Sequence, residues 1–117
     1  MKKINIVKKS EDYNRIIKNK KGVSTIYFII NKEENNDNIP KFGITFVKKF
    51  GNAVTRNKIK RRIKSIIDNN NNIYENNNNY IIIAKKTVID LKYQELEREL
   101  IKNFEKIREK NYEEKSN

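Results

Sequence analysis

The segment of residues 41–67 constrains the fold most strongly, because the pattern of a strand changes within it into the pattern of a helix. Phe42, Ile44 and Phe46 alternate with smaller residues at the period of two that a pleated strand requires. Four isoleucines follow at i, i+4, i+7 and i+8, the spacing of one face of an α-helix: Ile59, Ile63, Ile66 and Ile67. The segment therefore predicts a strand followed by an amphipathic helix.

A tight turn is expected at residues 48–51, between this strand and this helix. Gly51 suits the turn because glycine adopts positive φ without steric cost. Asn52 or Thr55 can then cap the helix, since the side-chain oxygen of either residue accepts a hydrogen bond from a free backbone amide.

The expected helix carries only positive charge, because no acidic residue occurs in it before Asp68. Its cations are Arg56, Lys58, Lys60, Arg61, Arg62 and Lys64. Three like-charged pairs stand at i and i+4, and each destabilises a helix by about 0.2–0.5 kcal/mol. Arg56 and Lys58 also lie at the end where the helix dipole disfavours a cation. The face is either simply solvated or binds a polyphosphate, and its one-sided sign favours the second interpretation.

A helical projection places four polar side chains opposite the isoleucine face: Asn57, Lys60, Arg61 and Lys64. The last helix offers a comparison, because its acidic residues come early and its basic residues late, as the dipole prefers. That helix is typical of one selected for packing. Polyphosphate binding requires the cations of residues 56–64 to be exposed and free of the chain's own carboxylates.

The net charge is +12, from 27 Lys and Arg against 15 Asp and Glu, which is typical of a nucleic-acid-binding protein. A membrane-surface role is disfavoured, because no segment joins strong amphipathicity to exposed bulky apolar residues.

We expect no signal peptide, and the absence of cysteine fits a cytoplasmic location. The length indicates a single domain over residues 1–117, with a loose basic arm at 1–9 and a loose tail at 110–117.

The first half of the chain predicts a short helix and a strand. Ser10 is the expected cap of the helix. The apolar stripe of the helix consists of Tyr13, Ile16 and Ile17. Ser24–Ile30 is rich in β-branched and aromatic residues, which predicts a strand. We expect Thr25–Ile30 to pair antiparallel with the strand at 41–47, through a mobile loop.

The second half predicts a loop, a strand and a long helix. Residues 69–79 are rich in asparagine and are expected to form a loop. Tyr80–Ala84 is continuously apolar, as in a strand covered on both faces, and the strand–helix–strand order predicts that it runs parallel to 41–47. Asp90 is a candidate cap for the last helix. The apolar stripe of that helix is Tyr93, Leu96, Leu100, Phe104 and Ile107.

Groups for catalysis are scarce in this composition. There is no histidine and no cysteine, and the four aspartates are scattered over helix starts and loops without a spacing that would hold a metal. No phosphate-gripping glycine motif occurs. We therefore expect no catalytic residue and no metal site in the polypeptide itself, which we interpret as a binding protein.

Residues 42–64, FGITFVKKFGNAVTRNKIKRRIK, closely resemble the arginine-rich "RNR" segment of the protein component of bacterial ribonuclease P. The resemblance is highly specific, since several fixed residue types recur at the family's spacing. Weaker similarity extends to Asp12–Ile17 in the first helix, to Tyr80–Ala84 in the late strand and to Tyr93–Leu96 at the start of the last helix.

The resemblance implies a small α/β (α+β) two-layer sandwich with the order α-β-β(-β)-α-β-α and a left-handed β-α-β crossover. It implies an accessory subunit of the enzyme that removes 5′ leaders from precursor tRNA, in which a catalytic RNA with bound Mg²⁺ performs the cleavage. One protein would bind each RNA. The helix at residues 56–67 would lie against this RNA, and a cleft between the first helix and the sheet would receive the leader.

Residue roles follow from the same resemblance. The expected RNA contacts are Lys48, Lys49, Asn52, Arg56, Asn57, Lys60, Arg61 and Lys64. The two asparagines are candidates for hydrogen bonds to RNA or to a hydrated metal, with a helix cap as the alternative. Tyr13 is a candidate platform for a leader base, with a place at the rim of the core as the alternative. Ile17 replaces the family's second aromatic and leaves only apolar contact.

The other positions at which the sequence departs from the family pattern affect the expected leader cleft more than the basic helix. Ile26 stands where the family often has an arginine, and Asn31 where it has a tyrosine. Val47 replaces a frequent serine, and Lys92 occupies the usual Ser/Thr cap position of the last helix. The main alternative is a ribosomal or general RNA-binding protein without an enzymatic partner. A DNA-binding module is disfavoured because no paired helix-turn-helix precedes the basic helix.

Overall fold

The computed structural model describes the backbone of residues 1–116 and the side chains of residues 1–110. In chain order, its elements are η1 (Lys3–Asn5), α1 (Ser10–Lys18), β1 (Gly22–Ser24), β2 (Phe28–Glu34), β3 (Lys41–Phe46), α2 (Ala53–Asn69), β4 (Asn78–Ala84), η2 (Lys86–Val88) and α3 (Tyr93–Ser116), where η marks a 3₁₀ turn. The predicted α+β order is confirmed, with β1 as the additional short strand.

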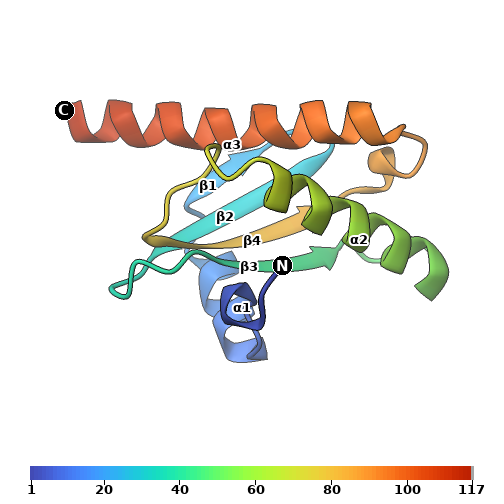
Figure 1. The fold of residues 1–117 in the computed structure, drawn as a ribbon, viewed down its shortest axis with the longest axis horizontal. Coiled ribbons are helices and arrows are strands. Elements are labelled where there is room, and N and C mark those ends of the chain that lie inside the picture. Colours follow the sequence, from blue (N-terminus) through green and yellow to red (C-terminus); the bar gives the residue numbers. More distant parts are fainter. Residues whose placement is uncertain (117) are drawn as a thin grey trace.

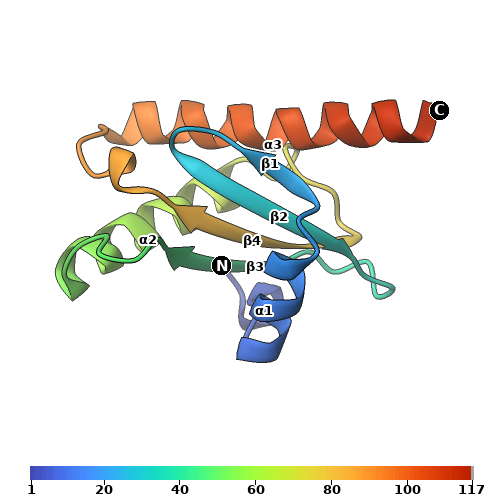
Figure 2. The ribbon, with the colours of Figure 1, turned by 180° about the vertical axis from the view of Figure 1, so that it is seen from behind.

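The four strands form one sheet in the order β1-β2-β4-β3 (Figures 1 and 2). β3 and β4 are parallel, as the strand–helix–strand pattern predicted, and Phe42 lies beside Tyr80 in their register. β2 pairs antiparallel with both β1 and β4.

The predicted antiparallel pair between residues 25–30 and residues 41–47 is wrong, because β4 lies between β2 and β3. The physical reason is the composition of β4. Tyr80 and Ile82 belong to the core under α2 and α3, whereas Ile81 belongs to the cluster under α1. A strand with both faces covered belongs in the interior of a sheet, so the continuously apolar β4 lies between β2 and the edge strand β3.

The predicted strand Ser24–Ile30 is interrupted by a turn at Thr25. Its hydroxyl oxygen accepts hydrogen bonds from the backbone amides of Tyr27 at 3.2 Å and Phe28 at 3.1 Å. A threonine side chain can in this way satisfy turn amides that would otherwise join a ladder. The chain therefore folds back, and β1 and β2 form a hairpin in place of one longer strand.

Helices cover the two faces of the sheet unequally. α2 and α3 cover one face and enclose the larger core, while α1 lies on the opposite face (Figures 1 and 2). The sheet and the helices α2 and α3 thus form the predicted two layers, and the short helix α1 packs on the opposite face of the sheet. The four predicted isoleucines of α2 are all at most 2% exposed, and burial of each such side chain contributes about 1.5–3 kcal/mol.

The N-terminal arm predicted to be loose is instead packed along the edge strand β3. Val7 is 6% exposed, and its amide donates to the carbonyl of Phe42 at 3.0 Å. The side chain of Asn5 donates to the carbonyl of Pro40 at 2.7 Å. An edge strand presents unpaired carbonyls, and the arm supplies donors to them.

Two predicted caps are also wrong. Ser10 is the first residue of α1 and its side chain makes no cap hydrogen bond. Asp90 lies before the start of α3, where the Lys92 amide instead donates to the Glu95 carboxylate at 3.0 Å. Glu95 thus makes one of the two hydrogen bonds of a capping box, the one from the N3 side chain back to the N-cap amide. The predicted loose tail at 110–117 lies largely outside the described side chains, and the backbone stays helical through Ser116.

Candidate nucleic-acid interface

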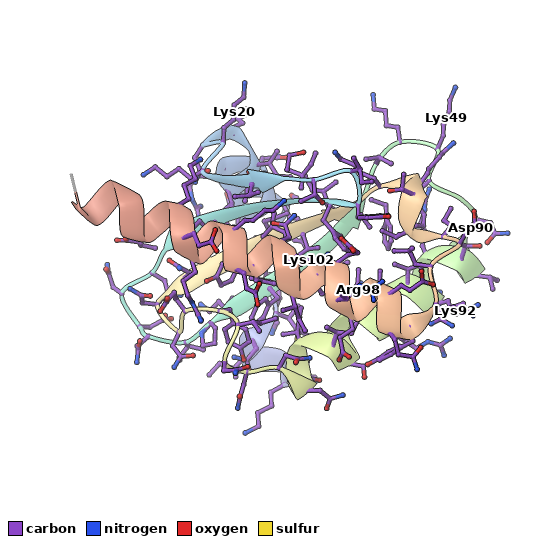
Figure 3. All side chains as sticks on the ribbon, turned by 90° about the horizontal axis from the view of Figure 1, so that it is seen from above. Lys20, Lys49, Asp90, Lys92, Arg98 and Lys102 are labelled. Atoms are coloured by element: carbon purple, nitrogen blue, oxygen red, sulfur yellow. The ribbon has the colours of Figure 1, made fainter. Side chains whose placement is uncertain are left out.

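The turn before α2 is built differently from the sequence-based expectation. Lys49, not Gly51, has the positive φ, at 60°. Phe50 is 2% exposed and packs against Phe46 with ring centroids 4.6 Å apart, so it anchors the turn. The side chains of Lys48 and Lys49 are consequently exposed, and Lys49 projects away from the domain (Figure 3).

Asn52 is the N-cap of α2. Its side-chain oxygen accepts from the Thr55 amide at 2.9 Å and from the Thr55 hydroxyl at 3.0 Å. Of the two candidate caps, the first is therefore correct, and Thr55 is its partner. These bonds engage the Asn52 oxygen, and the first turn of α2 contains no acidic residue.

The eight predicted RNA-contacting residues lie together on the turn and on α2, and we call them the cationic ridge: Lys48, Lys49, Asn52, Arg56, Asn57, Lys60, Arg61 and Lys64. All are exposed except Lys64, which is half-buried. Within the described part of the chain, none of the six cations in the ridge forms an ion pair. Asp68, the acid nearest to them in sequence, accepts from the Met1 amine at 2.7 Å.

The ridge therefore meets the condition set by the sequence. Its positive charges repel one another, all but the half-buried Lys64 are exposed, and none has an ion-pair partner among residues 1–110. Such a surface lowers its own electrostatic energy when it binds a chain of phosphates, which releases condensed counterions.

Tyr13 and Ile17 lie on the side of α1 that packs against the sheet. Both are half-buried around Val7, Ile16 and Ile81. A Cβ atom placed on Gly43 would lie 2.6 Å from Cζ of Tyr13, so the ring occupies the space that the glycine leaves open on β3. Burial raises the pKa of the Tyr13 hydroxyl, and a backbone hydrogen bond from Ile44 lowers it by less.

Ile26 and Asn31 are two positions of the expected cleft at which the sequence departs from the family pattern, and the structure shows where each side chain lies. Ile26 lies in the turn between β1 and β2 and is 67% exposed. Asn31 lies on β2 and is 7% exposed. Of the residues expected in the cleft, Tyr13 is therefore the aromatic one, and its ring is partly exposed beside the sheet.

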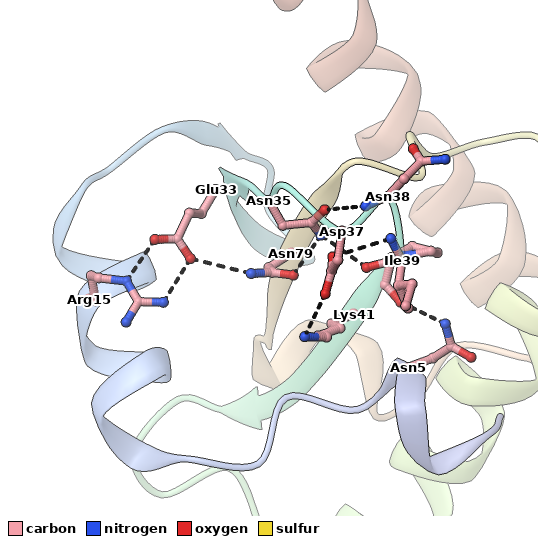
Figure 4. Close-up of polar contacts among 10 residues, drawn as sticks. Asn5, Arg15, Glu33, Asn35, Asp37, Asn38, Ile39, Lys41 and Asn79 are labelled. Atoms are coloured by element: carbon pink, nitrogen blue, oxygen red, sulfur yellow. Dashed lines mark hydrogen bonds and ion pairs between the residues drawn. The ribbon is translucent and has the colours of Figure 1, made fainter.

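A forked ion pair ties α1 to the sheet (Figure 4). Arg15 donates from Nε to Glu33 Oε1 at 2.6 Å and from Nη2 to Glu33 Oε2 at 2.9 Å. Asn79 of β4 donates to the same carboxylate at 3.4 Å, and Asn35 donates to Asn79 at 3.0 Å. The hydrogen bonds from Arg15 are the main reason why the pKa of Glu33 is lowered.

A groove of about 430 Å³ lies between the N-terminal arm, α1 and the starts of β3 and β4. Its basic lining residues include Lys3, Lys8 and Lys9, which are exposed. Sequence reasoning missed this groove because it assumed a loose arm. The signal was present in Ile6 and Val7, an apolar pair in an otherwise basic segment.

Within residues 1–110, no group of three or more Asp or Glu side chains is arranged to hold a metal ion. None of the helices in the described part is both long and apolar enough to span a membrane. Three surfaces described above could contact a nucleic acid: the cationic ridge, the side of α1 around Tyr13 and the basic groove beside the N-terminal arm.

The fold and these surfaces define a class: a small basic α+β domain with a mixed four-stranded sheet and a helix whose cations form no ion pair with the side chains that the structure describes. A family model described as Ribonuclease P matches residues 1–108. The chain belongs to the family of protein components of bacterial ribonuclease P. It is thus a subunit of a ribonucleoprotein endoribonuclease of tRNA processing, whose partner is an RNA subunit.

Individual relatives agree with this assignment. The chain is 39% identical over 109 residues to the ribonuclease P protein component of Mycoplasma mycoides subsp. mycoides, covering 92% of this chain and 100% of the relative. It is 39% identical over 101 residues to that of Streptococcus pneumoniae, covering 86% and 82% of the two chains. The solved RNase P protein of Staphylococcus aureus superposes with a TM-score of 0.74 at 31% identity, over 86% of this chain and 93% of that one.

Proposed function

We propose that the cationic ridge binds the catalytic RNA of ribonuclease P and that the side of α1 around Tyr13 receives the 5′ leader of precursor tRNA. The RNA subunit, with its bound Mg²⁺, would then cleave the leader, with one protein on each RNA in the cytoplasm. The protein contributes binding and positioning, since the composition lacks the usual acid–base and thiol groups.

The observation that carries this proposal is the set of six ridge cations without an internal partner in the described chain. Arg56 and Arg61 present planar forks that match phosphate oxygens, whereas the lysines act as point charges. A binding surface of this kind favours a polyanion, and family membership identifies an RNA subunit as the partner.

The leader assignment is supported by the position of Tyr13. Its ring lies against the backbone of Gly43, so a rigid surface supports one side of it. A half-exposed aromatic ring held in this way can stack a nucleobase of any identity, because every base has a π-face.

Reconstitution tests the proposal. The purified chain is mixed with the ribonuclease P RNA of the same organism at low Mg²⁺, and cleavage of a precursor tRNA is followed. We expect faster cleavage than with the RNA alone, because the protein lowers phosphate repulsion and holds the leader. A well-folded chain that leaves the rate unchanged would contradict the proposal.

A further inference from the structure

A second concave surface lies on the flank of α2 that faces the start of α3. We call it the notch; it measures about 360 Å³ and is lined by Lys58, Arg61, Arg62, Ser65 and Tyr93. Two helices contribute to it, so its shape is set by the packing of α2 on α3. Arg61 belongs both to the notch and to the cationic ridge, which makes the two surfaces continuous over the crest of α2.

The notch is positively charged, and its cations have no ion-pair partner in the described part of the chain. Lys58 and Arg61 are exposed and Arg62 is half-buried, and none of the three is ion-paired within the described residues. The nearby acids of α3 have other partners. Glu95 accepts from the Lys92 amide, and Glu97 accepts from the Asn70 side chain at 3.1 Å. Lys58 and Arg62 form a like-charged i, i+4 pair whose repulsion an anion would relieve.

Two hydroxyl groups complete the notch. Ser65 Oγ and Tyr93 Oη lie 2.8 Å apart, and either of them can donate to the other. The pair has two hydroxyl protons, and the bond between them uses one. The second proton is free to donate to another acceptor, and a phenol is the better donor to an anion.

We propose that the notch is a phosphate-binding pocket for the backbone of the catalytic RNA, adjoining the cationic ridge at Arg61 and adding Ser65 and Tyr93 to the contact. Lys58, Arg61 and Arg62 supply the charge, and Ser65 donates to Tyr93, whose hydroxyl donates to a phosphodiester oxygen. The proposal rests on the proposed function, since it assigns a second contact to the same RNA. It gives α3 a direct role in RNA binding through Tyr93.

The test measures the affinity of the full chain for the catalytic RNA by filter binding at several salt concentrations. Tyr93→Phe removes one hydroxyl and no charge, so we expect about three- to tenfold weaker binding with an unchanged salt slope. Arg62→Ala should instead lower the slope by roughly one. Tyr27→Phe loses a hydroxyl outside the notch and serves as the matched control, for which we expect unchanged affinity.

Ser65→Ala separates RNA binding from a structural role of the hydroxyl pair. In this variant the Tyr93 hydroxyl still reaches a phosphate but loses its Ser65 donor, so we expect a loss of about two- to threefold, smaller than that of Tyr93→Phe. Thermal unfolding by circular dichroism is measured for both variants. Equal affinity losses for Ser65→Ala and Tyr93→Phe, in proportion to their losses of stability, would show that the pair only joins α2 to α3, and would overturn the proposal.

A position-specific readout is available because the chain has no cysteine. A hydroxyl-radical probe attached at Gln94→Cys, beside Tyr93, should cut the catalytic RNA strongly at a discrete site. The same probe at Lys106→Cys, about 20 Å further along α3, should cut that site weakly or not at all. Equal cutting from both positions would overturn the proposal.

The outcomes also separate the notch from the proposed function. If Lys60→Ala weakens binding while Tyr93→Phe and Arg62→Ala do not, the notch proposal is wrong and the cationic ridge remains the binding surface. If none of these variants changes RNA affinity, and the chain does not stimulate cleavage, the proposed function itself is wrong.

Discussion

Gly43 of β3 provides the space in which the ring of Tyr13 lies. A Cβ at residue 43 would meet Tyr13 Cζ at 2.6 Å and Ile81 Cδ1 at 2.7 Å. The absence of a side chain on the strand therefore sets how closely α1 approaches the sheet. It also determines how close the Tyr13 ring, which we assign to leader binding, lies to the sheet.

Replacing Gly43 with alanine should therefore disturb α1 more than the rest of the domain. We expect Gly43→Ala to lower the free energy of unfolding by about 1–3 kcal/mol, because the new methyl group forces a packed ring to move. Urea denaturation measures this change. Gly51→Ala is the matched control, since its Cβ would meet Thr55 at an ordinary 3.6 Å. Equal costs at the two positions would contradict the role assigned to Gly43.

Removal of the Tyr13 ring should affect substrates that carry a leader. We expect Tyr13→Ala to weaken binding of precursor tRNA to the reconstituted enzyme by about 1–3 kcal/mol, the contribution of a stacked base. Binding of mature tRNA, which has no leader, should be unchanged. Tyr13→Phe keeps the ring and should bind both RNAs normally. An equal loss for the two RNAs would indicate that Tyr13 only supports the fold.

Much of this architecture could be predicted from local patterns. The isoleucine spacing identified the buried face of α2, and the continuous apolar run at Tyr80–Ala84 identified a strand covered on both faces. The exposure of the ridge cations followed from the same helical projection. These features depend on the spacing of apolar and polar residues along the chain, which can be read directly from the sequence.

The errors have a common physical origin in contacts between distant segments. Strand order depends on which strand needs two covered faces, and the expected pairing of residues 25–30 with 41–47 ignored that competition. The arm at 1–9 is held by carbonyls of residues 40 and 42 that become available only once β3 forms a sheet edge. The notch likewise depends on Tyr93 meeting Ser65 across 28 positions, which no local pattern indicates.

The cationic ridge should control the salt dependence of RNA binding. We expect Arg56→Ala and Lys60→Ala each to weaken binding to the catalytic RNA and to reduce the slope of log affinity against log salt by roughly one. Lys106→Ala removes an exposed cation from α3, outside the ridge, and should leave the slope nearly unchanged. Unaltered slopes in the two ridge variants would mean that this face is merely solvated.

Asn52 has two candidate roles that substitutions can separate. Asn52→Ala removes the cap of α2 and should lower the free energy of unfolding by about 1 kcal/mol. Asn52→Asp keeps the cap and adds a negative charge that the helix dipole favours, so stability should be retained or increased. The same charge lies within the ridge and should weaken RNA binding. An Asn52→Asp variant with full stability and full affinity would place residue 52 outside the RNA contact.

Acid should weaken the link between α1 and the sheet through Glu33. Its pKa is lowered from the ordinary value of 4.5, chiefly by the hydrogen bonds from Arg15. The unfolded chain therefore binds a proton at Glu33 more readily than the folded chain does. The stability that this carboxylate contributes is present above about pH 4.5 and is lost as the pH falls through the lower, folded-state value.

Glu33→Gln tests this linkage by thermal unfolding from about pH 7 to about pH 3. The variant should be less stable than the unmodified chain at neutral pH, and the difference in melting temperature should shrink as the pH falls below about 4.5. Glu34→Gln removes the same charge from the next, exposed position and should show a smaller and flatter difference. Because Arg15 holds α1 in place through Glu33, Glu33→Gln should also reduce affinity for leader-bearing tRNA at neutral pH. A difference that stays constant down to acidic pH would show that the ion pair contributes nothing to holding α1 against the sheet.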